Sequence, residues 1–334
     1  MINLFILSVF FSITFPVAAL FYKDIPEKKV VASKNSVKEH VTFYAIKEEG
    51  SNERIGRKGI LVKRDNAKAT ILILHGYSRD KFDVGPFRIF LSDYNCFTFD
   101  FRAHGEHIED QCSTLGYDEI YDIFAAIDYL KSRPDLKDKP IFIFGFSMGA
   151  ASAIEAQSLD PNLCQAMFLD APFTSSVDVL HKILSKLKVG IWGYEFDLPG
   201  CGLLEKYAFN PYVQSIIRYL LKKIANVNDV NIETLVKPIN PVESIKNITI
   251  PTYFVVCKND SKSSPESVEQ IYENANGYKR LWITNGREHC DSVFYDPEEY
   301  LKRLNNFFMD VITKKIYSQD PEIVLIDKDE VVVQ

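Results

Sequence analysis

The sequence predicts an α/β fold in which helices cover both faces of a mostly parallel β-sheet. Short apolar runs alternate with segments of helical periodicity from about residue 41 to residue 314, and this alternation is typical of such sheets. The chain has 334 residues, of which 46% are hydrophobic. It is therefore long enough and apolar enough to bury the core of a large α/β domain.

The predicted strands begin with an antiparallel pair at residues 41–46 and 59–63. The later runs are short, rich in β-branched or aromatic residues, and followed by turn residues, as expected for buried strands. They lie at residues 71–74, 97–101, 141–144, 166–169, 253–256 and 281–283.

Helices are predicted between these runs. Residues 117–132 place apolar side chains at helical spacing and end before Pro134. Residues 148–158 are rich in alanine, and residues 297–310 form the last amphipathic pattern. Another helix is expected to begin at Ser264, a preferred N-cap residue that is followed by proline.

The N-terminal segment, residues 1–22, is predicted to be a signal peptide or a membrane anchor. Residues 2–22 carry no charged side chain, and this length lies between that of a signal peptide and that of a membrane-spanning helix. Small residues before Leu20 favour cleavage after Ala19 and export. An uncleaved membrane anchor remains the alternative, because Lys23, Lys28 and Lys29 follow the apolar stretch.

The rest of the chain divides into a spacer, one large domain and a tail. Residues 23–40 are charged and irregular, residues 41–314 carry the alternating pattern, and residues 315–334 form either an additional strand or hairpin or a mobile tail. Within the large domain, residues 173–247 are too long for a simple crossover and contain an apolar, helical stretch at 213–225. We expect this insertion to form a helical lid over the ends of the strands.

Composition restricts the classes of partner. The net charge is −6 and basic residues do not cluster, so nucleic acid is not an expected partner. The six cysteines show no Cys-x-x-Cys spacing. Both disulfides in an exported protein and buried free thiols remain compatible with this pattern.

A Gly-x-Ser-x-Gly motif predicts a nucleophilic serine. Gly145, Ser147 and Gly149 directly follow the run 141–144 and begin the alanine-rich helix. A serine on a tight turn from strand to helix projects its hydroxyl above the sheet, and the flanking glycines relieve crowding there. The helix N-terminus also favours the negative charge that develops during nucleophilic attack.

A serine nucleophile needs a base and an acid that orients the base. His289 follows the last core strand, which is where the chain order serine, acid, histidine places the base. Asp260 leaves the sheet one strand earlier and is the predicted acid, whose carboxylate would fix the histidine tautomer. Asp170 also follows a strand and is the alternative acid.

Two backbone amides are predicted to form an oxyanion hole. His75 and Gly76 follow the first core run of the sheet, at the position of an oxyanion loop. The N–H groups of Tyr77 and Met148 would together bind the oxygen of a tetrahedral intermediate.

The segment around residues 100–107 admits a metal site as an alternative, with His104, His107, Asp110 and Cys112 as potential ligands. No pair among them has the spacing of a known zinc motif on a predicted helix. We therefore expect a structural loop held by Asp100 and Arg102 rather than a metal centre.

Together, these motifs resemble the α/β-hydrolase superfamily, and the pattern is most similar to the branch of serine-aminopeptidase and prolyl-oligopeptidase-like hydrolases. The resemblance extends from about residue 41 to residue 310, except in the lid. It implies an α/β-hydrolase fold with an eight-stranded, mostly parallel sheet, a Ser-His-Asp triad and no metal or organic cofactor. Ala103 and Cys257 stand where glycine is common in the family, so the local backbone at these positions is expected to differ.

The function predicted from the sequence is hydrolysis of carboxylic esters or thioesters of hydrophobic acyl groups through an acyl-enzyme. The Leu, Ile and Tyr content of the lid and the apolar N-terminus favour a small-molecule or lipid-like acyl substrate. A serine exopeptidase or amidase is one alternative, in which Glu195 or Asp197 of the lid holds the α-amine of the substrate. A catalytically silent binding protein on a hydrolase scaffold is the other. The sequence does not indicate an oligomeric state.

Overall fold

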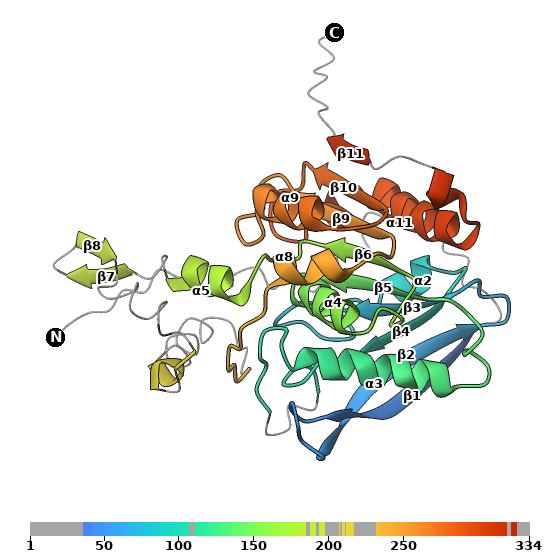
Figure 1. The fold of residues 1–334 in the computed structure, drawn as a ribbon, viewed down its shortest axis with the longest axis horizontal. Coiled ribbons are helices and arrows are strands. Elements are labelled where there is room, and N and C mark those ends of the chain that lie inside the picture. The colour runs from blue at the N-terminus through green and yellow to red at the C-terminus, as the bar shows by residue number, and fades with distance from the viewer. Residues whose placement is uncertain are drawn as a thin grey trace, which may run out of the picture.

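The computed structural model describes residues 36–106, 111–184, 188–191, 194–197, 207, 209–210, 212–216, 232–318 and 322–325 (Figure 1). The predicted leader at residues 1–22 lies outside the described residues, as do His107, Asp110 and most of the predicted helical stretch at 213–225. No helix in the part of the chain that the structure describes is long and apolar enough to cross a membrane.

Among the described residues, nine strands form one sheet in the order β1-β2-β4-β3-β5-β6-β9-β10-β11. Their bounds are β1 (Ser36–Ile46), β2 (Arg54–Arg64), β3 (Thr70–Leu74), β4 (Asn95–Phe99), β5 (Ile141–Phe146), β6 (Ala166–Asp170), β9 (Thr252–Cys257), β10 (Lys279–Thr284) and β11 (Glu322–Leu325). Strand β2 pairs antiparallel with β1 and β4, and the other pairs are parallel. The predicted mostly parallel sheet is confirmed.

The bounds of all eight predicted strands differ from the prediction by one or more residues, and two of these differences and one additional strand are notable. Strand β1 begins at Ser36, so the last residues of the predicted spacer belong to the sheet. Strand β4 ends at Phe99, two residues before the predicted end, and the N–H of Phe101 donates to Nε2 of His75 (3.0 Å). Strand β11 lies in the tail and pairs parallel with β10, which adds a further strand at the edge of the eight predicted ones.

Helices cover both faces of the sheet (Figure 1). Side chains of α3 (Glu119–Ser132), α4 (Met148–Leu159) and α9 (Pro265–Asn274) pack in one apolar cluster, and those of α2 (Phe87–Phe90) and α11 (Pro297–Ile312) pack in the other. Two further short segments are α8 (Pro241–Ser244), which continues into the 3-10 turn η1 (Ile245–Asn247), and α10 (Ser292–Tyr295). A second 3-10 turn, η2 (Lys315–Ser318), follows α11.

The sequence of β5 explains how one strand serves two cores. Ile141 and Ile143 belong to the cluster on the α3 and α4 side, whereas Phe142 and Phe144 belong to the cluster on the α11 side. Alternate side chains of a strand point to opposite faces, so a strand that is buried on both faces is apolar throughout. The ring of Phe142 stacks on Phe308 of α11 with ring centroids 4.6 Å apart.

The insertion between β6 and β9 is not purely helical in its described part. It contains α5 (Ser176–Leu184) and an antiparallel pair formed by β7 (Lys188–Ile191) and β8 (Tyr194–Asp197). These elements lie to the left of the main sheet in Figure 1. Apolar residues alternate with other residues in both strands, a two-residue period that suits a strand and not a helix.

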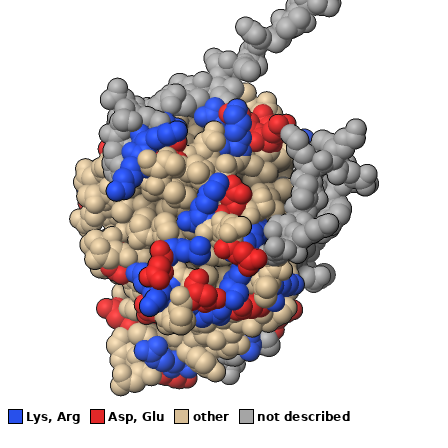
Figure 2. Space-filling view, turned by 90° about the vertical axis from the view of Figure 1, so that its right-hand side faces the viewer, with Lys and Arg blue, Asp and Glu red and all other residues tan. Residues whose placement is uncertain are grey.

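Charged side chains of both signs are interspersed over the face of the molecule in Figure 2. An exposed ion pair such as Lys68–Asp93 (2.7 Å) contributes only about 0–1 kcal/mol. The two apolar clusters therefore stabilise the fold far more than the surface charges do.

Candidate active site

Ser147 lies on the turn between β5 and α4 in a strained backbone conformation, with φ 49° and ψ −112°. Residues held in such sparsely populated regions cost about 1–3 kcal/mol and persist only where their surroundings hold them. Here the N–H of Ser147 donates to the carbonyl of Asp170 (2.8 Å), and the carbonyl of Ser147 accepts from Ala151 (2.9 Å). The predicted nucleophile elbow is thus fixed on both sides.

The glycines of the motif allow this close packing. A Cβ at Gly149 would lie 2.6 Å from the carbonyl oxygen of His75, and a Cβ at Gly145 would lie 2.9 Å from the Cα of Ala150. Both contacts involve backbone atoms that no rotamer change can move away. The motif therefore reflects the approach of the elbow to the end of β3 and to the first turn of α4.

The three predicted triad residues form one chain of hydrogen bonds. Nε2 of His289 lies 2.7 Å from Oγ of Ser147, and Nδ1 of His289 lies 2.7 Å from Oδ2 of Asp260. Because Nδ1 donates to the carboxylate, Nε2 is left to accept the serine hydrogen. His289 lies 142 positions after Ser147 and 29 positions after Asp260 in the chain, so the fold brings the three residues together.

The carboxylate of Asp260 is buried and well supplied with donors. Its side chain is 0% exposed, and its second oxygen, Oδ1, accepts from the N–H groups of Lys262 and Ser263, both at 2.8 Å. Two backbone donors fix the orientation of the carboxylate, which in turn fixes the imidazole ring.

Cys257 fits where the family commonly has glycine, because the loop that carries His289 leaves room for its thiol. A Cβ at Gly286 would lie 2.5 Å from Sγ of Cys257. The thiol also lies 3.1 Å from the hydroxyl of Ser292, at the start of α10. The departure from the family pattern is therefore accommodated by a glycine in the facing loop.

Asp170 does not contact His289. Its Oδ2 accepts a hydrogen bond from the hydroxyl of Tyr300 (2.7 Å), and its side chain is completely buried. Burial, with a smaller contribution from the charge of Asp260, raises the pKa of Asp170 to about 7. The alternative acid thus lies beneath the elbow, where its backbone carbonyl holds Ser147 and its carboxyl packs against α11.

Asp170→Asn is expected to reduce the loss of stability as the pH rises from about 4 to about 7. The pKa of Asp170 is about 7 in the folded chain and has a usual value of 3.8. The unfolded chain therefore releases its proton first, and folding stability falls across this window by an amount on the order of a few kcal/mol. Asparagine keeps the shape and does not titrate. Denaturant unfolding at pH 4.5 and pH 7.5 measures the difference, and an identical pH dependence in both proteins would contradict it.

The predicted oxyanion residues lie beside the serine. A Cβ at Gly76 would be 3.4 Å from Cβ of Ser147, so the loop that leads to Tyr77 passes directly against the elbow. Met148 follows the serine at the first position of α4. Within the described residues, neither the amide of Tyr77 nor that of Met148 donates a hydrogen bond to the protein.

Strained backbone positions recur in the loops around the site. Positive φ angles occur at Ser78 after the oxyanion loop, at Ala171 after β6 and at Cys290 after His289. Ala103 also has a positive φ, of 59°, which explains why glycine is common at this position in the family. Strain of this kind requires a rigid surrounding structure, and it is concentrated at functional sites.

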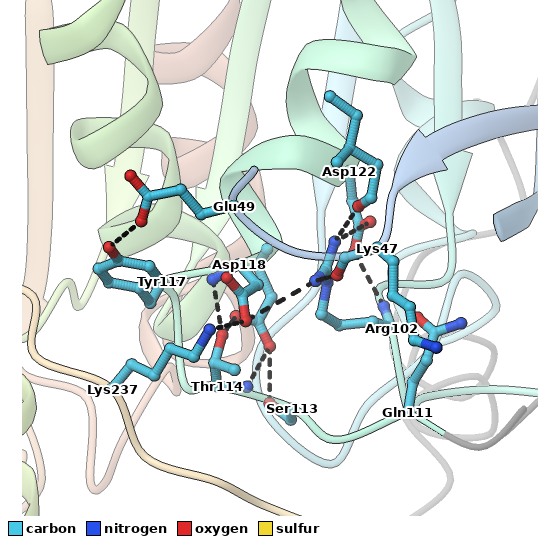
Figure 3. A network of polar contacts seen from close by, with 12 residues as sticks. Lys47, Glu49, Arg102, Gln111, Ser113, Thr114, Tyr117, Asp118, Asp122 and Lys237 are labelled. Carbon is cyan, nitrogen blue, oxygen red and sulfur yellow. Dashed lines mark hydrogen bonds and ion pairs between the residues drawn. The ribbon is translucent and has the colours of Figure 1, made fainter. Parts of the chain in front are cut away.

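The loop at residues 100–106 makes structural contacts in its described part. Asp100 accepts from the N–H of Lys81 (2.8 Å), and Arg102 pairs with Asp122 of α3 (2.9 Å), as Figure 3 shows for Arg102. Nδ1 of His104 lies 2.7 Å from the carbonyl of Arg102, and burial lowers the pKa of His104 to about 4. Among the described residues, no three His, Cys, Asp or Glu side chains are grouped to hold a metal ion.

Neither Thr234 of the insertion nor Ser113 was identified from the sequence, although both lie next to the predicted oxyanion loop in the structure. The hydroxyl of Tyr77 lies 2.6 Å from the hydroxyl of Thr234, a residue 157 positions away. The isolated bridge between Ser113 and Thr234 brings a second segment to the same place. No motif marks these residues, because a single threonine in a long insertion carries no recognisable spacing.

Comparisons with known proteins show the family and the fold of the chain. A family model described as the alpha/beta hydrolase family matches residues 71–303. The protein YqkD of Bacillus subtilis (strain 168) is 24% identical over 253 residues, which cover 75% of this chain and 74% of YqkD.

Two solved structures have a similar fold. The esterase Pf2001 of Pyrococcus furiosus matches with a TM-score of 0.58 and 22% identity over 82% of this chain and 92% of that chain. The acylaminoacyl peptidase of Pyrococcus horikoshii matches with a TM-score of 0.57 and 16% identity over 85% of this chain and 44% of that chain.

Proposed function

Because the chain belongs to the alpha/beta hydrolase family, we propose that it is a serine hydrolase with Ser147 as nucleophile, His289 as base and Asp260 as orienting acid. The observation that carries the proposal is the continuous chain of two 2.7 Å hydrogen bonds that joins these three side chains. A nucleophile, a base and an orienting group within hydrogen-bond distance of one another are the geometric signature of such catalysis.

The first half of the reaction forms an acyl-enzyme. Oγ of Ser147 attacks the carbonyl carbon of the substrate while Nε2 of His289 takes the serine proton. The imidazolium that results is stabilised by the carboxylate of Asp260. His289 then gives the proton to the leaving group as the carbonyl re-forms and the bond to the leaving group breaks.

The amides of Tyr77 and Met148 are proposed to bind the oxyanion of the tetrahedral intermediate. Both belong to backbone that lies against Ser147, and Met148 is at the N-terminus of α4, where the helix dipole favours negative charge. Each donor of this kind is worth roughly a hundredfold to a thousandfold in rate.

The second half of the reaction releases the acyl group. His289 removes a proton from a water molecule, the hydroxide that forms attacks the acyl carbon, and the proton returns to Oγ of Ser147 as the ester bond to the enzyme breaks. No further group is needed to balance the reaction.

Carboxylic esters or thioesters of hydrophobic acyl groups are the proposed substrates. Large apolar side chains are exposed on the described part of the insertion, namely Val177, Tyr207, Phe209, Tyr212 and Ile216. The similarity in fold to the Pyrococcus furiosus esterase is in keeping with ester hydrolysis. The similarity to an acylaminoacyl peptidase keeps an amidase or exopeptidase as the second candidate.

A panel of matched substrates separates these candidates. We expect p-nitrophenyl butyrate and octanoate to be hydrolysed at higher kcat/KM than p-nitrophenyl esters of N-acetylated or free amino acids. Since the leaving group is the same in all of them, a preference for the aminoacyl esters, together with turnover of the corresponding p-nitroanilides, would transfer the assignment to a peptidase.

We further propose that residues 1–22 direct export or anchor the protein in a membrane. Strand β1 begins at Ser36, so the described sheet is assembled from residues that follow the leader. Sequencing the mature N-terminus and locating the protein by fractionation separate the two fates. A chain that begins at Leu20 indicates cleavage, whereas Met1 in the membrane fraction indicates an anchor; an intact Met1 in the soluble fraction would contradict both.

A further inference from the structure

The last part of the insertion is joined to the body of the domain directly beside the site. We call residues 233–237 the lid stem. Ser113 donates its N–H to the carbonyl of Glu233 (2.8 Å), and its carbonyl accepts from Leu235 (2.8 Å). These two bonds form a parallel bridge between Ser113 and Thr234, so the lid stem is held in register with the loop that precedes α3.

This loop is itself rigid. The carboxylate of Glu119 is fully buried and accepts from the hydroxyl of Ser113 (2.7 Å), the N–H of Thr114 (2.9 Å) and the N–H of Gly116 (2.8 Å). A buried carboxylate that lost these donors would be left without solvation, so the loop conformation is strongly specified. The loop therefore provides a fixed support for the lid stem.

Contacts of a charged side chain, that of Lys237, also attach the lid stem to the loop that precedes α3. Lys237 of the lid stem pairs with Asp118 (2.7 Å), and its Nζ lies 5.1 Å from the centre of the Tyr117 ring. Figure 3 shows Lys237 directed at Asp118, with Tyr117 directed at Glu49 on the other side. The lid stem is thus attached through its backbone on one side and through Lys237 on the other.

The bridge touches both residues whose amides are proposed to bind the oxyanion. Thr234 places its hydroxyl 2.6 Å from the hydroxyl of Tyr77, and Ser113 places its hydroxyl 3.7 Å from Sδ of Met148. Thr234, Ser113 and Met148 are buried. The two proposed oxyanion donors lie in the loop after β3 and at the start of α4. The bridged pair contacts both places, through Thr234 at Tyr77 and through Ser113 at Met148.

We propose that Thr234 and Ser113 are positioning residues that hold Tyr77 and Met148, and with them the two oxyanion donors, at the separation that the transition state requires. This inference rests on the proposed function. The strained turn at Ser78 (φ 59°) directly after Tyr77 needs such an anchor, because its own backbone conformation is unfavourable. In this proposal the lid stem is a part of the catalytic apparatus.

The expected effect follows from the geometry of the oxyanion hole. Its donors act only when they lie about 2.7–3.1 Å from the developing oxyanion, and a displacement of about 1 Å costs up to about a hundredfold in rate. Loss of the Tyr77–Thr234 contact loosens the loop without removing either amide. We therefore expect kcat to fall roughly tenfold while KM changes little, since the ground state gains less from the donors than the transition state.

Two conservative variants test the contact, Tyr77→Phe and Thr234→Val. Each removes one hydroxyl and keeps the size of the side chain. The same tenfold loss in kcat is expected for each variant and for the double variant, because both changes break one contact. The affinity for an alkyl boronic acid, a transition-state analogue, should fall in parallel with kcat/KM. Thr234→Ser keeps the hydroxyl and should retain the kcat of the wild type.

Tyr117→Phe is the matched control. It removes a tyrosine hydroxyl that bonds Glu49 (2.7 Å), and it leaves the ring beneath Lys237. This variant removes a hydroxyl close to the lid stem and leaves the contact between Tyr77 and Thr234 in place, so its kcat should equal that of the wild type.

The outcomes separate the two levels of the account. A wild type that hydrolyses esters, together with Tyr77→Phe and Thr234→Val variants of unchanged kcat, would overturn the positioning role of Thr234 and Ser113 and leave the proposed function intact. An effect on KM or thermal stability alone would do the same. A wild type that neither hydrolyses esters nor is labelled at Ser147 by an alkyl fluorophosphonate would overturn the proposed function, and the positioning role with it.

Discussion

Ser147→Ala is expected to fold like the wild type and to lose kcat for ester hydrolysis by roughly four to six orders of magnitude. Alanine keeps the Cβ that the turn already accommodates at φ 49°, so the strain of the elbow does not change. The oxygen that attacks the substrate is lost, and neither His289 nor the oxyanion donors can replace it.

Steady-state turnover of p-nitrophenyl butyrate, with circular dichroism to confirm folding, measures this effect. Ser158→Ala is the control on the same helix, because its hydroxyl bonds only the carbonyl of Glu155 (2.7 Å) in the described structure. The control should keep full turnover. If Ser147→Ala retained even a tenth of the wild-type kcat, Ser147 would not be the nucleophile.

Asp260→Asn is expected to lower kcat by about four orders of magnitude, whereas Asp170→Asn should leave kcat within a few-fold of the wild type. An asparagine amide at residue 260 would donate to Nδ1 of His289 and place the ring proton on Nε2, so that the ring no longer accepts the serine proton. Asp170 contacts Tyr300 and not His289, so its charge is not part of this chain of hydrogen bonds.

Asp260→Asn and Asp170→Asn serve as controls for one another, because each replaces a buried carboxyl near the end of a strand with an amide. kcat measured at one pH for both proteins is sufficient. A larger loss for Asp170→Asn than for Asp260→Asn would transfer the orienting role to Asp170.

Much of the fold follows from local patterns that the sequence displays. The buried strands are apolar throughout, and the helices begin at cap residues such as Ser264, whose side chain accepts from the N–H of Ser267 in the structure. Ser147 could be predicted because its motif combines spacing with a strand–helix context. His289 and Asp260 could be predicted from chain order, since each follows a strand whose position in the sheet is fixed by the fold.

Other features could not be predicted, because they depend on contacts between distant segments. The strand pair β7–β8 lies in an insertion for which a helical lid was expected. For the tail, the sequence left a further strand, a hairpin and a mobile segment open, and the pairing of β11 with β10 in the structure decides for the strand. The contact between Tyr77 and Thr234 joins residues 157 positions apart. The compatibility of Cys257 with its site depends on Gly286 in a different loop. Periodicity and motif spacing carry no information on such pairs.

The central claim, that Ser147 is the nucleophile of a serine hydrolase, is tested most directly by locating the covalent adduct of an alkyl fluorophosphonate. Such a reagent phosphonylates a serine that is activated by a neighbouring base, with loss of fluoride. We expect one adduct per chain on the peptide that contains Ser147, and none in Ser147→Ala. An adduct on another residue, or an unlabelled protein that still hydrolyses esters, would contradict this claim.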